Sequence, residues 1–506
     1  MYGLKDTVRR DLPNMTTAQA TRTGADQGFD PALRRLALVV LSGAIMTILD
    51  TTIVTVAIKT LGTSFHTSLS TIQWVVTGYT LALSMAIPIT GWAVERFGAR
   101  TMWLISLVLF ISGSALCGAA WSVGSLIAFR IVQGFGGGLL MPIGQTMLAR
   151  AAGPERMGRV MAVVAVPAML GPVLGPIIGG LIVDHLSWRW MFFVNVPFCV
   201  IALVLAVRLL PRDADRKADA RLDTLGLALL SPGLAALVYG LSEAGSGSGL
   251  TSGKFLGGVG VGAVLIAAFA VHSLRRGQDA LVDIRVFRNR SFSTTSIGIF
   301  IYSGSLFALF VLLPLYFQLV RHNSPLQSGL LFAPLGLGAM ITMPISGRLT
   351  DRMGSRTLAA AGAVIVLAGV LVFTRIQVDT STYLLTAAAF VVGLGHGLMM
   401  PAMMGGAYRG LSRSDVPNAT TAFNILVRIG GAFGTAALAV VLQNYLRDRF
   451  PHTGGSLGAV AAIRSPGAAV QLTGAFGDTF WWSLAIIVAA LVPILLIPRR
   501  SPAPAQ

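Results

Sequence analysis

The sequence predicts an all-α integral membrane protein in which two six-helix bundles flank two inserted helices. Three observations lead to this architecture. Of the 506 residues, 54% are hydrophobic and only 11% are charged, whereas soluble domains carry roughly 25% charged residues. Apolar runs of membrane-spanning length recur along the chain, and a loop motif near residue 91 recurs near residue 347. A soluble enzyme, a disordered chain and a disulfide-stabilised secreted domain are therefore disfavoured.

Fourteen apolar runs are long enough to cross a bilayer, which takes about 20 residues of helix. The predicted spans are residues 36–58, 72–93, 102–122, 124–148, 157–183, 189–210, 225–242, 255–275, 292–319, 326–348, 357–376, 381–404, 416–443 and 479–498. Residues 1–32 are polar and precede the first run, so we expect residues 1–35 to form an N-terminal tail and not a cleaved signal peptide. Residues 499–506 form a second tail.

Basic residues set the orientation, because cytoplasmic loops of membrane proteins are enriched in Lys and Arg. With a cytoplasmic N-terminus, 28 of the 38 basic residues fall on the cytoplasmic side and eight on the other. We therefore expect a multi-pass protein of the plasma membrane with both termini cytoplasmic. The net charge of +18 follows this pattern, and no nucleic-acid-binding motif accompanies it. Cys117 and Cys199 lie inside apolar runs, so neither a disulfide framework nor a metal site is expected.

An internal repeat relates the two ends of the chain. Gly91–Arg100 and Gly347–Arg356 share the pattern G-x-x-x-[ED]-R-x-G-x-R at an offset of 256 residues. Gly134–Pro142 matches Gly393–Pro401 at an offset of 259 residues. Matches in register indicate two parallel six-span units that face each other across a cavity, as in transporters built from repeats.

The repeat also defines an insertion. The spans 225–242 and 255–275 repeat nothing in either half. We therefore expect a first bundle at 36–210, a linker with two inserted transmembrane helices at 211–291, and a second bundle at 292–498. The inserted pair is expected at the periphery, beside the junction of the bundles, where it lines no central cavity.

Asp50 lies in the middle of the first span, where a carboxylate costs about 2.5–3.5 kcal/mol to insert. Thr47, Thr51 and Thr55 accompany it at helical spacing, so this polar face is expected to border an aqueous cavity. Burial favours the protonated carboxyl, which makes Asp50 a candidate reversible proton carrier. The alternative is a structural carboxylate paired with an arginine.

Two arginines also lie within spans. Arg130 shares a helix face with Gln133 and stays charged when buried, so it can tune a carboxylate in proton coupling or bind an anionic group. A packing ion pair is the alternative. Arg428 is followed by glycines and fits either a coupling or a structural role. The candidate residues of the substrate cavity are Thr47, Thr51, Gln133 and Asn424.

The fifth span is dense in Gly–Pro pairs. Its motif residues are Gly171, Pro172, Gly175, Pro176 and Gly179. One face of this helix lacks side chains and some N–H donors, so it can pack tightly and bend. We expect a role in conformational change, with plain helix packing as the alternative.

The repeated charged turn is a candidate ionic latch that stabilises one state of alternating access. Glu95 can accept hydrogen bonds from a helix N-terminus or pair with arginine, and Arg100 lies at the start of the next helix. A topological anchor is the alternative. The candidate latch residues are Gly91, Glu95, Arg96, Gly98 and Arg100, with Asp351 and Arg352 in the second copy.

Together these motifs resemble the major facilitator superfamily, specifically its fourteen-span drug:proton antiporters of the EmrB/QacA type. Leu49–Ala57 is similar to the first-span motif of that family and Gly91–Arg100 to its cytoplasmic loop signature. Arg130–Gly138 resembles the fourth-span motif, and Gly171–Gly180 the antiporter motif. Trp188–Pro197 is similar to the segment that enters the sixth span.

The resemblance implies a role for particular residues: Asp50 as proton acceptor, Arg130 in proton coupling, and Glu95 and Arg100 in the latch. The sequence departs from the family pattern at Ile58 and Lys59, which stand where Leu-Pro is usual, and at Glu95, which replaces a more frequent Asp. Neither departure touches the proton-coupling residues.

We expect a monomeric exporter of bulky lipophilic compounds or drugs, which exchanges them for protons and works within the lipid bilayer. No phosphate-binding G-x-x-x-x-G-K-[ST] motif occurs, so the energy source is an ion gradient and no cofactor is expected. The alternatives are export of a native lipid or metabolite on the same scaffold, proton-coupled uptake, and a non-transporting receptor. Within the spans, the one negative charge of Asp50 stands against the two positive charges of Arg130 and Arg428. Neutral or amphiphilic substrates, including those with an anionic head, are therefore favoured over divalent cations.

Overall fold

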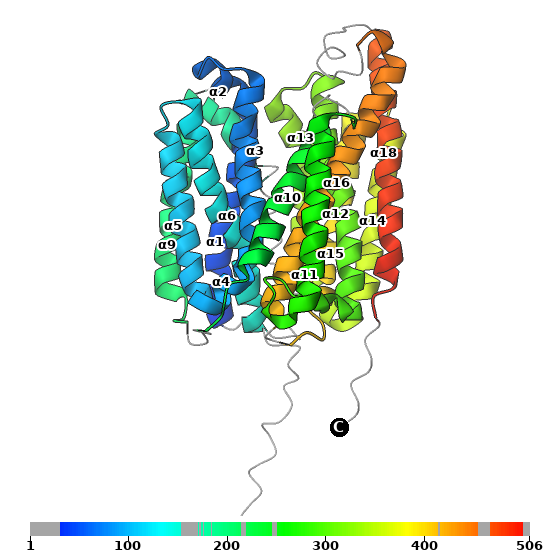
Figure 1. Cartoon of the computed structure of the whole chain (residues 1–506). Helices are drawn as coiled ribbons and strands as arrows, with labels where there is room; N and C mark the ends of the chain where they lie inside the picture. Colours follow the sequence, from blue (N-terminus) through cyan, green and yellow to red (C-terminus); the bar gives the residue numbers. More distant parts are fainter. Residues whose placement is uncertain are drawn as a thin grey trace, which may run out of the picture.

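The computed structural model describes residues 31–152, 171, 174–175, 177–183, 185–213, 219–244, 250–412, 415–453 and 466–498. Within these ranges it contains helices and no strand, and 13 helices are long and apolar enough to cross a membrane. They run side by side along one axis, as Figure 1 shows. The all-α membrane fold predicted from the sequence is therefore confirmed. The fifth predicted span, 157–183, falls largely outside the described residues.

The helices of the N-terminal part pack as one bundle, in which α6 contacts α1, α3 and α5, and α9 contacts α1 and α5. Its helices are α1 (Pro31–Val56), α2 (Ile58–Ser64), α3 (Leu69–Ala86), η1 (Ile87–Ile89), α4 (Thr90–Phe97), α5 (Ala99–Gly118), α6 (Val123–Ala152), α8 (Trp190–Phe193) and α9 (Asn195–Leu209). The segment from α3 through η1 to α4 is nearly continuous, because Pro88 breaks the helix only locally.

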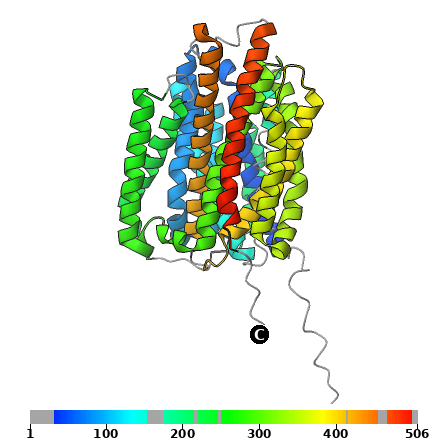
Figure 2. The same cartoon turned by 90° about the vertical axis from the view of Figure 1, so that its right-hand side faces the viewer.

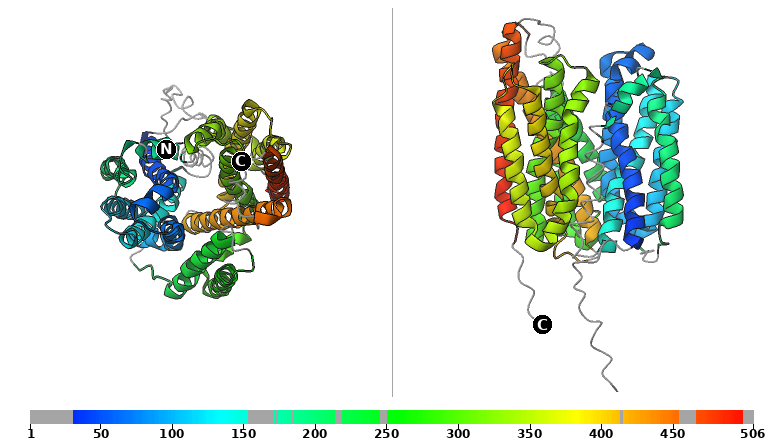
Figure 3. Two further views of the ribbon diagram at one scale, coloured as in Figure 1. Left: turned by 90° about the horizontal axis from the view of Figure 1, so that it is seen from above. Right: turned by 180° about the vertical axis from the view of Figure 1, so that it is seen from behind.

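The helices of the C-terminal part form a second bundle, in which α15 contacts α13 and α14, and α12 contacts α16 and α18. Its helices are η4 (Ile284–Arg288), α12 (Arg290–Leu319), α13 (Pro325–Met353), α14 (Ser355–Thr374), α15 (Thr382–Ala407), α16 (Val416–Arg449), η5 (Pro451–Thr453) and α18 (Pro466–Leu495). Seen from above, the two bundles lie next to each other with α16 along their junction (Figure 3).

The sequence repeat is also a repeat of backbone geometry. Gly98 separates α4 from α5 with φ 92° and ψ 152°, and Gly354 separates α13 from α14 with φ 85° and ψ 153°. Only glycine adopts such a positive φ without strain. Both turns lie at the same end of the molecule (Figure 1). The equivalent glycines therefore make the same sharp reversal in each bundle.

Close helix crossings repeat as well. A Cβ atom on Gly134 or Gly138 of α6 would overlap the backbone of α3, and one on Gly393 or Gly397 of α15 would overlap the backbone of α13. Helices without side chains at the contact can approach this closely, which is how membrane helices gain packing energy. The glycines that the repeat singled out thus hold equivalent helix pairs together.

The inserted helices are α10 (Thr224–Ala244) and α11 (Gly253–Arg276), and they lie beside the junction of the bundles (Figures 2 and 3). α10 contacts α3 of one bundle and α16 of the other. The rings of Trp74 and Tyr239 stack with centroids 5.8 Å apart, and Ser231 Oγ donates a hydrogen bond to the Met85 carbonyl at 2.8 Å. α11 packs on α10, and only 11% of its apolar stretch is buried, against 44% for α10. A position at the periphery therefore describes α11 but not α10.

Asp223 ties the ends of the inserted helices together, with the short helix η3 (Gly277–Asp279) following α11. Its carboxylate accepts hydrogen bonds from the backbone N–H groups of Gly226 and Leu281 at 3.0 and 3.1 Å, and from His272 Nε2 at 2.9 Å. Arg276 lies 3.5 Å away. Burial by itself raises the pKa of Asp223, but the Gly226, His272 and Leu281 donors outweigh it and hold that pKa below its usual range.

Candidate functional site

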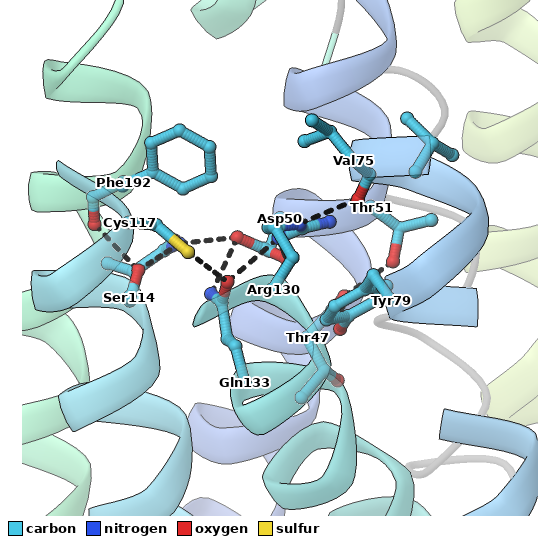
Figure 4. Close-up of polar contacts among 12 residues, drawn as sticks. Thr47, Asp50, Thr51, Val75, Tyr79, Ser114, Cys117, Arg130, Gln133 and Phe192 are labelled. Atoms are coloured by element: carbon cyan, nitrogen blue, oxygen red, sulfur yellow. Dashed lines mark hydrogen bonds and ion pairs between the residues drawn. The ribbon is translucent and has the colours of Figure 1, made fainter. Parts of the chain in front are cut away.

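A buried ion pair lies inside the first bundle. Asp50 on α1 and Arg130 on α6 are both 0% exposed, and Arg130 Nη1 is 2.6 Å from Asp50 Oδ2 (Figure 4). Gln133 Nε2 and Asn195 Nδ2 each donate a hydrogen bond to Asp50 Oδ1 at 2.9 Å. Both carboxylate oxygens are thus satisfied, and the cluster joins α1, α6 and α9.

Arg130 is held from several sides. Its Nη1 also donates to Gln133 Oε1 at 2.8 Å, and its Nε donates to the Val75 carbonyl at 3.2 Å. Its guanidinium carbon lies 4.0 Å from the centre of the Tyr79 ring. A charge removed from water needs a counter-charge and a full set of hydrogen bonds. Loss of the charge on Asp50 would therefore leave Arg130 as a buried cation without a counter-charge.

Sequence reasoning assigned no role to Asn195. The structure makes it a link, because its Nδ2 donates both to Asp50 and to Ser114 Oγ at 3.1 Å, and Ser114 Oγ in turn donates to the Phe192 carbonyl at 2.8 Å (Figure 4 shows Ser114 and Phe192). The only signal in the sequence was a polar amide at the start of the apolar sixth span, within Trp188–Pro197.

A cavity of about 860 Å³ lies between the two bundles. Its described lining comes from α1, α3, α12, α13 and α16, and also from Val238, Leu241 and Ser242 of α10. The prediction that the inserted pair lines no central cavity is therefore wrong. The physical reason is that α10 packs across the junction of α3 and α16, so one of its faces closes the space between the bundles.

Asp50 points away from this cavity. Thr51 and Thr55 are among the lining residues, whereas Asp50 and Thr47 are not. Successive residues of a helix are rotated by about 100°, so Thr51 faces the cavity while Asp50 faces α6 and α9. The expectation that the carboxylate itself borders the cavity is wrong for this conformation. Thr47 is buried and donates its hydroxyl to the Ala44 carbonyl at 2.9 Å.

The remaining candidate cavity residues lie elsewhere. Gln133 belongs to the Asp50 cluster, whereas Asn424 joins the bundles, since its Nδ2 donates to Gln145 Oε1 of α6 at 2.6 Å. Arg428, one turn further along α16, lines the cavity. The structure therefore brings Asp50, Arg130 and Gln133 together and leaves Arg428 outside their hydrogen-bonded cluster.

The bundles meet at the end of the molecule that carries Gly98 and Gly354. There Gly91 of α4 packs on α16, since a Cβ on it would lie 3.5 Å from Thr421 Oγ1. The Asn424–Gln145 hydrogen bond lies on the same side of the cavity, whose lining extends the other way to Gln318 of α12. This conformation is thus closed at the turn end, and its cavity lies toward the opposite end.

Asp213, which the sequence did not single out, holds the first turn. Asp213 accepts hydrogen bonds from the backbone N–H groups of Arg100 at 2.9 Å and Thr101 at 3.0 Å, which caps α5. The Arg100 side chain donates to the Val207 carbonyl at 2.8 Å. Glu95 lines a second pocket, of about 910 Å³, at this end of the molecule.

The other latch candidates lie at helix ends and turns. Arg96 lies in the last turn of α4, and Arg352 is exposed at the end of α13. The side chain of Asp351 lies outside the described residues. Gly98 is the turn residue whose positive φ reverses the chain between α4 and α5.

Part of the Gly–Pro motif packs directly on α1. A Cβ atom on Gly171 would overlap Ile48, and one on Gly175 would overlap Thr52, whose hydroxyl donates to the Gly171 carbonyl at 3.0 Å. Gly179 is buried, whereas Pro172 and Pro176 lie outside the described residues. The bare face of this segment therefore contacts α1 on both sides of the level of Asp50.

Comparison with known families decides what this architecture is. Residues 40–435, most of the chain, match the sequence profile of the Major Facilitator Superfamily. The chain belongs to the major facilitator superfamily. As a major facilitator it is a multi-pass membrane transporter and not an enzyme.

This major facilitator is similar in sequence to two curated relatives and in fold to one solved structure. It is 37% identical over 493 residues to the multidrug resistance protein B homolog of Mycobacterium tuberculosis, a match covering 93% of this chain and 91% of that protein. It is 31% identical over 428 residues to the multidrug export protein EmrB of Haemophilus influenzae, covering 83% and 82%. The proton:xylose symporter XylE superposes with a TM-score of 0.59 at 15% identity, covering 91% of this chain and 94% of that one, which shows the shared fold.

Proposed function

We propose that this protein is a proton-coupled antiporter that exports bulky lipophilic compounds by alternating access, with Asp50 as the proton carrier. The observation that carries the proposal is the fully buried Asp50–Arg130 pair, with its two amide donors, on a helix that also lines the cavity through Thr51. An ionisable residue inside a membrane domain is a functional candidate by default.

The geometry supports a coupling step. With Asp50 charged, the carboxylate holds α1, α6 and α9 together through Arg130, Gln133 and Asn195. Protonation removes the counter-charge of Arg130, and an unpaired buried charge is strongly destabilising. Proton binding therefore favours a conformation in which this cluster is rearranged. The free-energy difference between the two conformations changes by as much as their affinities for the proton differ.

The kind of substrate is supported by the cavity and by the relatives. The cavity presents Phe307, Phe310 and Phe332 on one side and small residues of α16 on another, which suits flat or bulky apolar bodies. Both relatives described above are named for resistance to, or export of, multiple drugs. Export of a native lipid or metabolite uses the same machinery, so a panel of drugs and lipids is the means of choosing between them.

The proposal extends to location and energy source. We place the protein in the plasma membrane as a monomer, with both termini and the Gly98 and Gly354 turns in the cytoplasm, because the basic residues favour that side. The conformation described here is then closed to the cytoplasm, and the proposed role of the turn residues, including Glu95, Arg96 and Arg352, is to stabilise it. The proton gradient supplies the energy, and no cofactor is involved.

The test is exchange by purified protein in liposomes that carry a pH-sensitive dye. Adding the neutral lipophilic probe N-phenyl-1-naphthylamine should release protons from the wild type. Asp50→Asn should abolish this release and keep probe binding, since the amide has the size of the carboxyl but cannot cycle a proton. Asp478→Asn is the matched control, because Asp478 of α18 pairs with Arg449 at the end of α16 and does not line the cavity. Normal proton release by Asp50→Asn would remove Asp50 from the mechanism.

A further inference from the structure

Arg428 differs from Arg130, the other membrane-embedded arginine, in its contacts with the residues that the structure describes. Arg130 has a carboxylate, an amide oxygen and a carbonyl as acceptors. Among the residues that the structure describes, Arg428 makes neither an ion pair nor a hydrogen bond. A guanidinium carries five N–H donors in a fixed planar fork, so those donors are left to whatever fills the cavity.

The cavity gives Arg428 a distinctive position, since it is the one charged side chain among the described residues that line it. Asp50 cannot neutralise it, because Asp50 is fully buried and its two oxygens are taken by Arg130, Gln133 and Asn195. The cavity therefore carries a net positive charge at one point of an otherwise neutral wall.

The cavity leaves space for a ligand beside Arg428. On the same face of α16, the residues one to three turns after Arg428 are small. The face consists of Gly431, Ala432, Thr435, Ala436 and Ala439. Phe307, Phe310 and Phe332 line the cavity from α12 and α13, and hydroxyl groups of Thr51, Thr55 and Thr80 line it from α1 and α3. The charged Arg428, a helix face of small residues and three phenylalanine rings thus line the same cavity.

We infer that Arg428 is the binding site for the acidic group of an amphiphilic organic anion, whose apolar or aromatic body packs against the phenylalanines of the same cavity. A carboxylate or a sulfonate can present two oxygens to such a fork and accept two parallel N–H bonds, and these charge-assisted bonds are the strong ones. A dication would meet an uncompensated positive charge instead. This inference rests on the proposed export function for the cavity and specifies its substrate class.

The test compares two probes that differ in a single group. 8-Anilinonaphthalene-1-sulfonate and N-phenyl-1-naphthylamine share an anilinonaphthalene body, and only the first carries a sulfonate. Binding to full-length protein in nanodiscs is measured by fluorescence, with matched empty nanodiscs subtracted and no proton gradient applied. Arg428→Gln should weaken sulfonate binding about tenfold, as loss of charge-assisted hydrogen bonds predicts, and change binding of the neutral probe less than twofold.

Two further variants separate the possible outcomes. Arg428→Lys keeps the charge but loses the planar fork, so it should restore only part of the sulfonate affinity that Arg428→Gln loses. Lys254→Gln removes an exposed charge on α11 and should change the binding of neither probe. Equal weakening of both probes by Arg428→Gln, or no weakening of either, overturns the anion site. Because binding needs no proton exchange, the anion site survives if Asp50→Asn exchanges normally, and the coupling proposal survives if Arg428→Gln binds the sulfonate normally.

Discussion

Asp50 takes its three side-chain donors from positions 80, 83 and 145 residues along the chain. Charges within spans are rare because they are costly, so Asp50 and Arg130 could be singled out from the sequence. Asn195 could not, because an amide in an apolar span is compatible with many environments. Only the packing of α9 against α1 brings it within 2.9 Å of the carboxylate.

The contribution of Asn195 is open to measurement. Asn195→Ala removes one hydrogen bond to a buried charged acceptor and leaves Ser114 Oγ without that donor, which costs about 1.5–3 kcal/mol. We expect a lower unfolding temperature for the purified protein, measured by a thermal-shift assay. Asn444→Ala, at an exposed position of α16, is the control and should unfold like the wild type. Equal stability of the two variants would contradict the role assigned to Asn195.

At the scale of elements, α10 and α11 looked alike in the sequence and differ in the structure. Both are apolar runs, with mean hydropathies of 1.7 and 2.0 in their apolar stretches, and neither repeats elsewhere. Hydropathy reports whether a helix can enter the bilayer and does not report which neighbour covers it. The sequence therefore predicted two inserted helices but not that one of them would form a cavity wall.

A bulky residue on the cavity face of α10 should alter substrate range. Ser242→Trp places an indole at a lining position, so we expect weaker export of large compounds and little change for small ones. Val264→Trp is the control, since Val264 on α11 is 68% exposed and faces away from the bundles' junction. Export measured over a size series of dyes decides the matter. An identical profile for both variants would show that α10 has no part in selection.

The Asp223 cluster makes the stability of the α10–α11 pair depend on pH. Because the folded-state pKa of Asp223 lies below the ordinary value of about 3.9, its stabilising effect is complete above that value and is lost as pH falls through the folded-state pKa. Asp223→Asn should therefore unfold at a lower temperature than the wild type at pH 7. The difference between the two unfolding temperatures should become smaller as the pH is lowered toward 3. A difference that stays constant with pH would contradict this account.

At the scale of the whole molecule, the sequence contained more than the composition of a membrane protein. The offset of the repeat predicted two equivalent bundles, and the paired turns at Gly98 and Gly354 have matching φ and ψ angles. The conformational state could not be predicted, because it depends on contacts between bundles. Gln145 and Asn424 meet across that junction from positions 279 residues apart.

The Gln145–Asn424 hydrogen bond should favour the conformation closed at the turn end. Asn424→Ala removes a hydrogen bond that stabilises the closed conformation by about 1 kcal/mol. The equilibrium between this conformation and the one open at the turn end then shifts roughly fivefold. Spin labels at Phe97→Cys and Met353→Cys, exposed positions that end α4 and α13, report the separation of the bundles at that end. Double electron–electron resonance should show a larger share of long distances in the variant. Asn444→Ala is again the control, and an unchanged distribution in Asn424→Ala would exclude this contact as a determinant.

The insertion of α10 and α11 as a pair has a consequence for topological parity. A hairpin of two spans leaves the bilayer on the side where it entered, so the second bundle starts on the same face as the first. One extra helix, or three, would invert the second bundle and carry the Gly354 turn to the opposite face from Gly98. The bundles could then no longer close against each other at one end. Between two parallel bundles, accessory helices can be gained or lost only in even numbers.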